Sequence, residues 1–99
     1  MADKKHEDSP LVVQGIKVKL TVADVDDYEV TEALVDMSDE DLPETDRAKA
    51  IVRLTRLLFG RDWERIKGEL RKKHDGKLTN ETVGSFITDV FTGLNRKNS

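Results

Sequence analysis

Residues 54–70, LTRLLFGRDWERIKGEL, place the only tryptophan of the chain, Trp63, shortly after an apolar helical stretch and a glycine. That glycine, Gly60, is of the residue type that most often follows the last turn of a helix. Ile66 and Leu70 lie three and seven residues beyond Trp63 and so share a helical face with it. The stretch therefore predicts two helices joined by a very short connection, with Trp63 at the joint.

Trp63 has two interpretations at this point. Apolar residues at helical spacing usually form core, so the indole would pack between the two helices. Tryptophan is also enriched among the residues that dominate protein interfaces, so Trp63 could be an exposed partner contact. The same choice applies to Leu57 and Phe91, which lie at the edges of the two most apolar helical stripes. We take these three residues as candidate partner-binding residues.

The two helices of this joint are accompanied by two further predicted helices. The helix before Gly60 begins at residue 45 or 46 and ends at 59, and the one after it covers 62–74. A last helix is capped by Thr79 and continues to residue 94, with Leu78 and Val83 as a hydrophobic staple. An acidic helix over 24–37 precedes them, with its apolar stripe formed by Val25, Tyr28, Leu34 and Val35.

The N-terminal part predicts a β-hairpin. Apolar and polar residues alternate from Ile16 to Val22, which is typical of a half-buried strand. With Gln14 and Gly15 as a two-residue turn, Val13 would face Ile16, and all apolar side chains would lie on one face. We expect an α+β fold that is mostly α, with a hairpin followed by about four helices in a small bundle. Residues 10–94 would form the single domain, 1–9 a disordered N-terminus and 95–99 a flexible tail.

Composition limits the class of protein. The chain has 99 residues, of which 36% are hydrophobic and 37% charged, and it contains no cysteine. This predicts one small domain without disulfides or a cysteine-based metal site. No apolar run reaches the roughly 20 residues that cross a bilayer, and the first ten residues lack the apolar region of a signal peptide. We therefore expect a cytoplasmic protein with no membrane partner.

The charges are divided along the chain. Residues 23–46 contain eleven acidic and no basic residues, whereas 47–77 contain eleven basic and four acidic residues. The two blocks could face each other within one chain or between subunits, which favours weak self-association. The basic segment 47–77 could alternatively bind nucleic acid, although the net charge of −3 and a lysine- and arginine-rich face argue against specific base reading. The candidate basic face is formed by Lys49, Arg53, Arg56, Arg61, Arg65 and Lys72.

No pattern of catalytic or ligand-binding residues is present. His6 and His74 have no partner at metal-ligand spacing, and Ser85 lacks the sequence context of a nucleophile. No glycine-rich loop with the spacing of a phosphate-binding motif occurs. We expect a protein that is not an enzyme and that has no cofactor or metal.

The order of these parts resembles a known family. A short hairpin with a glycine turn, VVQGIKVKL, precedes an acidic helix, AIVRLTRLLFGRDWERI and a closing helix behind LTNETV. This resembles the small tail assembly chaperones of long-tailed bacteriophages, especially those of Gram-positive hosts. The element order matches over about residues 11–94, and the residue-level match is confined to Leu57, Leu58, Phe59, Gly60 and Trp63.

The resemblance implies a non-enzymatic role in phage tail morphogenesis. Proteins of that family bind the tape measure protein, keep it soluble and help tail tube subunits to assemble around it. They act in the cytoplasm of the bacterial host and are absent from the mature virion. The family has no catalytic residues to carry over to this sequence.

Overall fold

The computed structural model describes residues 11–98, with side chains to Arg96, and begins with a β-hairpin. Strands β1 (Leu11–Val13) and β2 (Ile16–Val18) pair antiparallel, with Val13 opposite Ile16 as predicted. Both turn residues have positive φ angles, 52° at Gln14 and 79° at Gly15. That combination defines a type I′ turn, whose twist matches that of the strands. The predicted disordered segment 1–9 lies outside the described residues.

The second strand is shorter than predicted, because a helix begins where the alternation continues. Strand β2 ends at Val18, and α2 (Val22–Val25) follows. Thr21 accepts a hydrogen bond from the backbone N–H of Asp24, and the Asp24 carboxylate accepts one from the Thr21 N–H at 2.8 Å. This reciprocal capping box ends the extended backbone. The prediction of a strand continuing to Val22 was therefore wrong.

The predicted acidic helix 24–37 is divided at its own aspartates. Asp27 caps a new helix, α3 (Tyr28–Ser38), by accepting a hydrogen bond of 2.7 Å from the Glu29 N–H. Its buried residues are Val30 and Ala33. Two members of the predicted stripe were placed on the wrong face, since Tyr28 is 75% and Val35 59% exposed.

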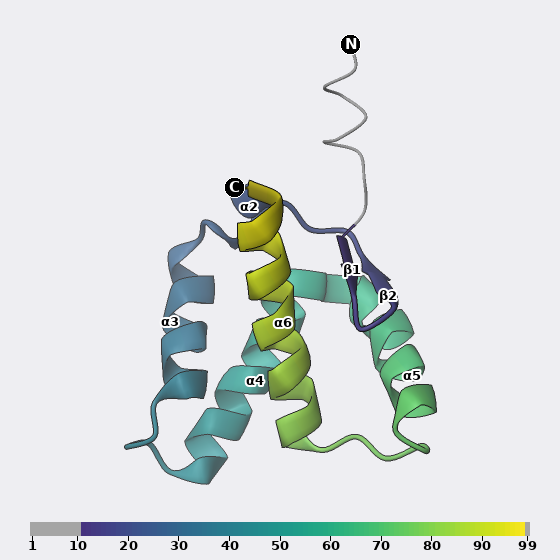
Figure 1. Ribbon diagram of the computed structural model, residues 1–99. Coiled ribbons are helices and arrows are strands. Elements are labelled where there is room, and N and C mark those ends of the chain that lie inside the picture. Colours follow the sequence, from purple (N-terminus) through teal and green to yellow (C-terminus); the bar gives the residue numbers. More distant parts are fainter. Residues whose placement is uncertain (1–10, 99) are drawn as a thin grey trace.

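Helices α3 and α4 form an antiparallel pair, followed by the predicted joint. Helix α4 (Glu44–Phe59) follows a five-residue loop and packs along α3 (Figure 1). Gly60 ends α4 with φ 54° and ψ −127°, and a short 3₁₀ turn, η1 (Gly60–Asp62), leads into α5 (Trp63–Lys73). Helix α4 ends at residue 59 as predicted, and α5 begins one residue later than predicted.

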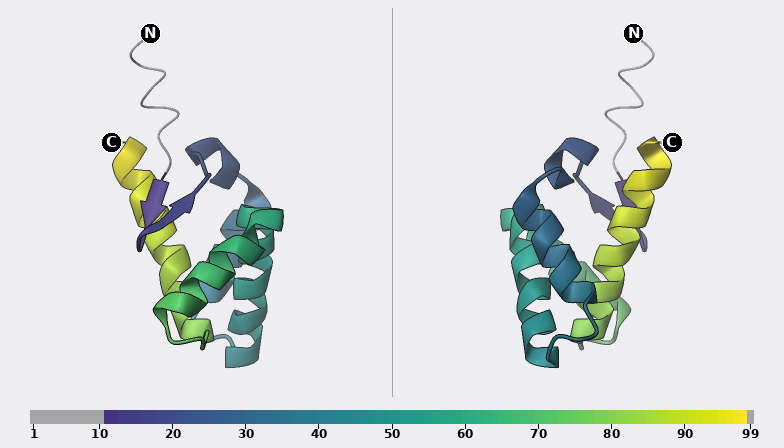
Figure 2. Two further views of the ribbon diagram at one scale, coloured as in Figure 1. Left: turned by 90° about the vertical axis from the view of Figure 1, so that its right-hand side faces the viewer. Right: turned by 90° about the vertical axis from the view of Figure 1, so that its left-hand side faces the viewer.

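The last helix, α6 (Asn80–Asn98), crosses the middle of the molecule (Figures 1 and 2). The Thr79 hydroxyl accepts a hydrogen bond of 3.1 Å from the Thr82 N–H, so the predicted N-cap is confirmed. The helix continues four residues past Leu94, and residues 95–98 are helical where a tail was predicted.

The hairpin lies between α6 and α5, and three contacts fix it there (Figure 1). The side-chain amide of Gln14 donates to Asp89 of α6 at 2.9 Å, and Arg65 of α5 donates to the carbonyl of Lys17 at 2.7 Å. A Cβ atom added to Gly93 would lie 2.9 Å from Leu11 Cδ1, so any other residue there would force the Leu11 side chain to shift.

These elements enclose one hydrophobic core, and the structure confirms the predicted α+β, mostly helical fold. Its largest fully buried side chains are Phe86, Ile16, Leu54, Ile66, Leu70, Ile87, Val18 and Val90. They come from β2, α4, α5 and α6, so each of those elements contributes to a single folding unit.

Candidate protein-binding groove

A groove of about 390 Å³ lies where α4, α5 and the start of α6 meet. It opens on the side of the α4–α5 joint that the other helices leave uncovered. Twelve residues line it: Ile51, Val52, Thr55, Arg56, Trp63, Glu64, Lys67, Arg71, Leu78, Thr79, Asn80 and Val83. Its lining combines apolar and cationic side chains, and each group has a structural origin.

Trp63 is the central apolar residue of the groove. Its ring stacks on that of Phe59, with centroids 5.6 Å apart and an angle of 16° between the planes. Phe59 is buried and its ring also contacts Phe86 of α6, at a centroid distance of 6.0 Å. Trp63 is half-buried against this core, so one face of the indole packs inward while the rest borders the groove. The packing interpretation holds for the inner face of Trp63, and its role as a partner contact stays a prediction.

The groove floor also includes apolar side chains that the rest of the fold covers only in part. Val52 on α4 is 45% exposed, and Ile51 and Leu78 are half-buried. Ile51 and Val52 come from α4, whereas Leu78 precedes α6. Their proximity depends on how the helices pack, and the sequence alone did not indicate it.

The rim of the groove carries mostly positive charge. Arg56 comes from the last turn of α4, and Lys67 and Arg71 come from successive turns of α5. Glu64 is the one carboxylate in the lining, and it pairs with Lys67 at 3.0 Å. Three cations against one carboxylate favour a ligand whose apolar residues are flanked by negative charge.

The predicted partner-binding residues do not all meet here. Trp63 lines the groove. Leu57 is 41% exposed on α4 but lies outside the lining, and Phe91 is half-buried against the core on α6. The structure therefore places one of the three in the groove.

The predicted basic face is distributed over several surfaces. Lys49 and Arg53 border a different depression, together with Asp36 and Asp46, and Arg53 pairs with Glu32 at 3.1 Å. This is the point at which the acidic and basic blocks meet within the described chain through an ion pair. Arg56 alone of the six belongs to the groove described above.

The remaining cations of that set lie around α5. Arg61 borders a depression that also contains Lys19 and Asp62, and Lys72 is exposed. Arg65 donates to Asp62 at 2.7 Å and to Glu69 at 2.8 Å, and the hydrogen bond to Asp62 holds the pKa of the Asp62 carboxyl below its ordinary value. The charge of Arg65 is therefore already paired with two carboxylates of its own chain, one in η1 and one in α5.

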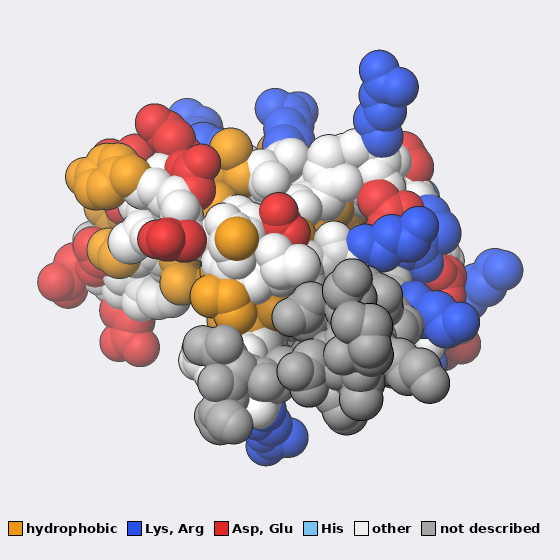
Figure 3. Space-filling view, turned by 90° about the horizontal axis from the view of Figure 1, so that it is seen from above, with side chains coloured by type: hydrophobic (Ala, Val, Ile, Leu, Met, Phe, Trp, Pro, Cys, Tyr) orange, Lys and Arg blue, Asp and Glu red, His pale blue; other side chains and the backbone are white. Residues whose placement is uncertain are grey.

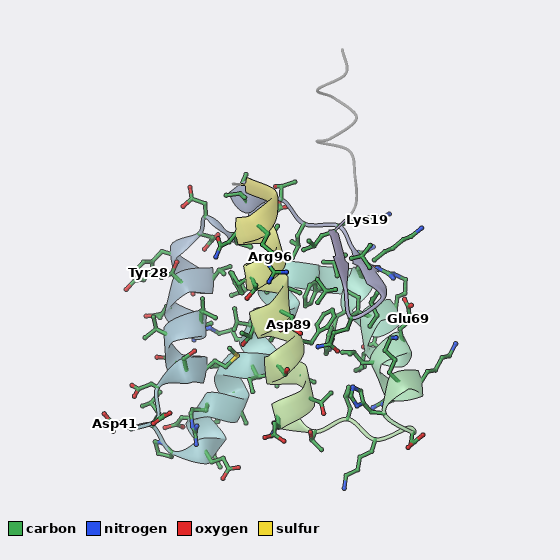
Figure 4. The ribbon with its side chains drawn as sticks, in the orientation of Figure 1. Lys19, Tyr28, Asp41, Glu69, Asp89 and Arg96 are labelled. Carbon is green, nitrogen blue, oxygen red and sulfur yellow. The ribbon has the colours of Figure 1, made fainter. Side chains whose placement is uncertain are left out.

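Acidic side chains gather on one side of the molecule, whereas the opposite side carries both charges. Seen from above in Figure 3, the side of α3 shows mostly acidic side chains, and the side of α5 shows most of the basic ones with acidic ones among them. In Figure 4 Tyr28 projects from α3 away from the other helices, and Glu69 and Lys19 lie at the opposite side. The acidic block of the sequence thus forms an acidic side of the molecule.

A further depression, of about 460 Å³, brings together residues that the sequence analysis treated separately. It is lined by Gln14, His74, Glu81, Thr82 and Ser85. A serine nucleophile needs a hydrogen bond to its base. The hydrogen bonds found over residues 11–96 include none between Ser85 and His74. The arrangement lacks the geometry that defines a catalytic pair.

Two kinds of feature are absent from the described part of the chain, a group of side chains suited to a metal ion and a helix able to span a membrane. Within residues 11–98, no group of three or more histidine, aspartate or glutamate side chains could hold a metal ion. No helix in that range combines the length and the apolar character needed to cross a membrane.

Comparisons with protein families, with curated proteins and with solved structures found no match for this chain. The observations that bear on function are therefore the groove, the surface charges and the resemblance in element order.

Proposed function

We propose that this protein is a non-enzymatic binding protein whose groove holds an amphipathic helix of another protein. The observation that carries the proposal is the combination of an apolar floor around Trp63 with a cationic rim. Helices with one apolar face commonly bind in such grooves, where apolar residues at helical spacing provide affinity. The rim would select helices that carry acidic residues beside the apolar stripe.

We propose further that the partner is a phage tape measure protein and that the protein acts in tail morphogenesis, before tail tube subunits assemble. Support comes from the resemblance in element order and from the residues Phe59, Gly60 and Trp63, of which Trp63 lines the groove and stacks on Phe59. A long helical protein exposes apolar stripes until it is enclosed, and a groove that covers part of such a stripe would reduce its aggregation. The setting would be the cytoplasm of the bacterial host.

The arrangement of cations gives less support to the alternative of a nucleic-acid-binding module. Phosphate binding needs several unpaired cations along one surface. Arg53 and Arg65 are both in ion pairs, and Lys49 lies beside Asp36 and Asp46. The alternative remains a prediction from the basic segment 47–77.

Replacing Arg56 and Arg71 together by alanine tests the binding function. We expect the double variant to fold normally, because both side chains are exposed. It should lose at least about tenfold in affinity for the partner, as expected when contacts at the edge of an interface hot spot are removed. The measurement is co-expression with a phage tape measure protein, followed by quantification of that protein in the soluble fraction and of the complex.

The matched control replaces Arg61 and Lys72 by alanine. It also removes two positive charges, but neither Arg61 nor Lys72 lines the groove. Wild-type behaviour of the control with loss in the Arg56 and Arg71 variant supports the proposal. Equal losses in both variants would show that only overall charge matters, and unchanged binding in both would contradict the groove as the binding site.

A further inference from the structure

Helix α3 presents an apolar stripe to solvent that its own fold does not use. Tyr28 is 75% and Val35 59% exposed, and they are seven residues apart, which places them on one face. In Figure 4 Tyr28 points away from the bundle. Isolated exposed apolar residues are common, but two on one helical face form the pattern that a groove recognises.

The surroundings of this stripe are strongly acidic. Glu32 lies on the same side of α3 as Tyr28 and Val35 by its helical position, and Asp36 lies between that side and α4. Glu32 also pairs with Arg53 of its own chain at 3.1 Å. The whole segment 23–46 contains eleven acidic and no basic residues. The stripe therefore has the composition that the groove favours, with apolar side chains flanked by carboxylates.

The stripe of one chain cannot reach the groove of the same chain. Helix α3 packs through Val30 and Ala33, and it meets α4 on the face that carries Ala50 and Arg53. The groove uses the different face of α4 that carries Val52. An α3 helix that occupies the groove must therefore belong to another molecule.

We propose that α3 of one copy docks in the groove of a second copy, with Tyr28 and Val35 toward Trp63 and the carboxylates toward the cationic rim. This deepens the proposed function, on which it rests, because the second copy and the partner protein compete for one groove. The contact joins different surfaces of the two copies, so it is a heterologous, head-to-tail interface. A single short helix in a groove of about 390 Å³ gives a small interface, so the association should be weak.

Self-association of this kind would regulate the groove. In the absence of the partner, the α3 helices of other copies cover the apolar floor. The partner then has to displace a weakly bound helix, so only segments that bind more tightly than α3 enter the groove. Opposite charges on exposed side chains hold the copies together, and dissolved salt screens them.

Sedimentation velocity of the full chain tests the association without any partner. We expect concentration-dependent self-association at about 20 mM salt and its loss, by about tenfold or more in the dissociation constant, at about 0.5 M salt. A monomer at both salt concentrations, over the micromolar to millimolar range of protein, would overturn the proposal.

A mixing experiment identifies the two surfaces. One variant carries Tyr28→Ser and Val35→Ser, which leaves the groove intact, and the other carries Arg56→Ala and Arg71→Ala, which leaves α3 intact. Each variant alone should be monomeric at low salt. An equimolar mixture should form a 1:1 dimer and nothing larger, because only one productive pairing of stripe and groove remains. A mixture that stays monomeric would overturn the proposal, as would wild-type association of the Tyr28 and Val35 variant alone.

Failure of this inference can be told apart from failure of the proposed function. The Tyr28 and Val35 variant should still keep the tape measure protein soluble, since the groove of the variant is unchanged. If it self-associates like the wild type while the Arg56 and Arg71 variant loses the partner, the second-copy proposal fails and the binding function stands. The control with Arg61→Ala and Lys72→Ala should self-associate like the wild type, and its dissociation would contradict the groove as the docking site.

Discussion

Replacing Trp63 by alanine is expected to lower the free energy of unfolding by about 2–3 kcal/mol, somewhat less than the cost of truncating a fully buried tryptophan. The indole is half-buried and loses its stacking on Phe59, 5.6 Å away. Because it also forms the groove floor, partner binding should weaken by at least about tenfold even under conditions where the variant is folded. Urea denaturation and a binding titration measure the two effects separately.

The variant Trp63→Phe distinguishes packing from binding. A phenyl ring can still stack on Phe59, so we expect a loss of only about 1 kcal/mol in stability. It fills less of the groove, so part of the loss in partner affinity should remain. If Trp63→Ala left stability unchanged, the stacking would contribute nothing to the joint. If it destabilised the fold but left binding unchanged in the folded protein, the groove floor would not be the contact surface.

The same substitution at two glycines should have opposite effects on stability. Gly60 has φ 54° and ψ −127°, a conformation that L-residues avoid, so Gly60→Ala should cost about 1–3 kcal/mol. Gly68 lies within α5, where alanine is favoured, so Gly68→Ala should stabilise the protein by about 0.5–1 kcal/mol. Urea denaturation of both variants at equal protein concentration gives the comparison.

Space around the two glycines does not determine this difference. A Cβ atom added at either position would have no neighbour outside its local backbone within 4 Å. The expected effect of each substitution is therefore a backbone effect, and each variant is the matched control of the other. Equal destabilisation by both would mean that Gly68 has a role that its open surroundings do not show.

Features set by local chemistry could be predicted from the sequence. The hairpin register follows from Gln14 and Gly15 together with alternation on both sides of the turn. Gly60 ends a helix because no other residue accepts its backbone angles easily, and Thr79 caps α6 through a bond to a residue three positions away. Each depends on residues close together in the chain.

Helix α3 shows where this reasoning failed. The predicted stripe used its large apolar residues, Tyr28 and Val35, whereas the buried positions are Val30 and Ala33. Alanine contributes little to a hydrophobic pattern, but its small side chain suits the buried face of a helix that packs closely on another. The break between α2 and α3 was missed because Asp27 acts as a cap, while acidic residues also occur within the first turn of a helix.

The groove could be predicted only in part. Trp63 was identified as a candidate contact because it follows a helix joint, but Val52 and Leu78 come from segments that only the packed helices bring together. The division of charge was visible in the sequence, yet over residues 11–96 one ion pair joins the two blocks, Arg53 with Glu32. Much of the acidic surface of α3 therefore remains available to another molecule.

Site-specific crosslinking tests most directly whether the groove binds the partner. A photoreactive phenylalanine derivative is introduced at Val52 in the groove or at Val12 on the outer face of the hairpin, which are 45% and 56% exposed. After co-expression with a phage tape measure protein, the proposed partner, and illumination, the protein with the probe at position 52 should form a covalent adduct with it, and the one with the probe at position 12 should not. An adduct from position 12 and none from position 52 would contradict the account.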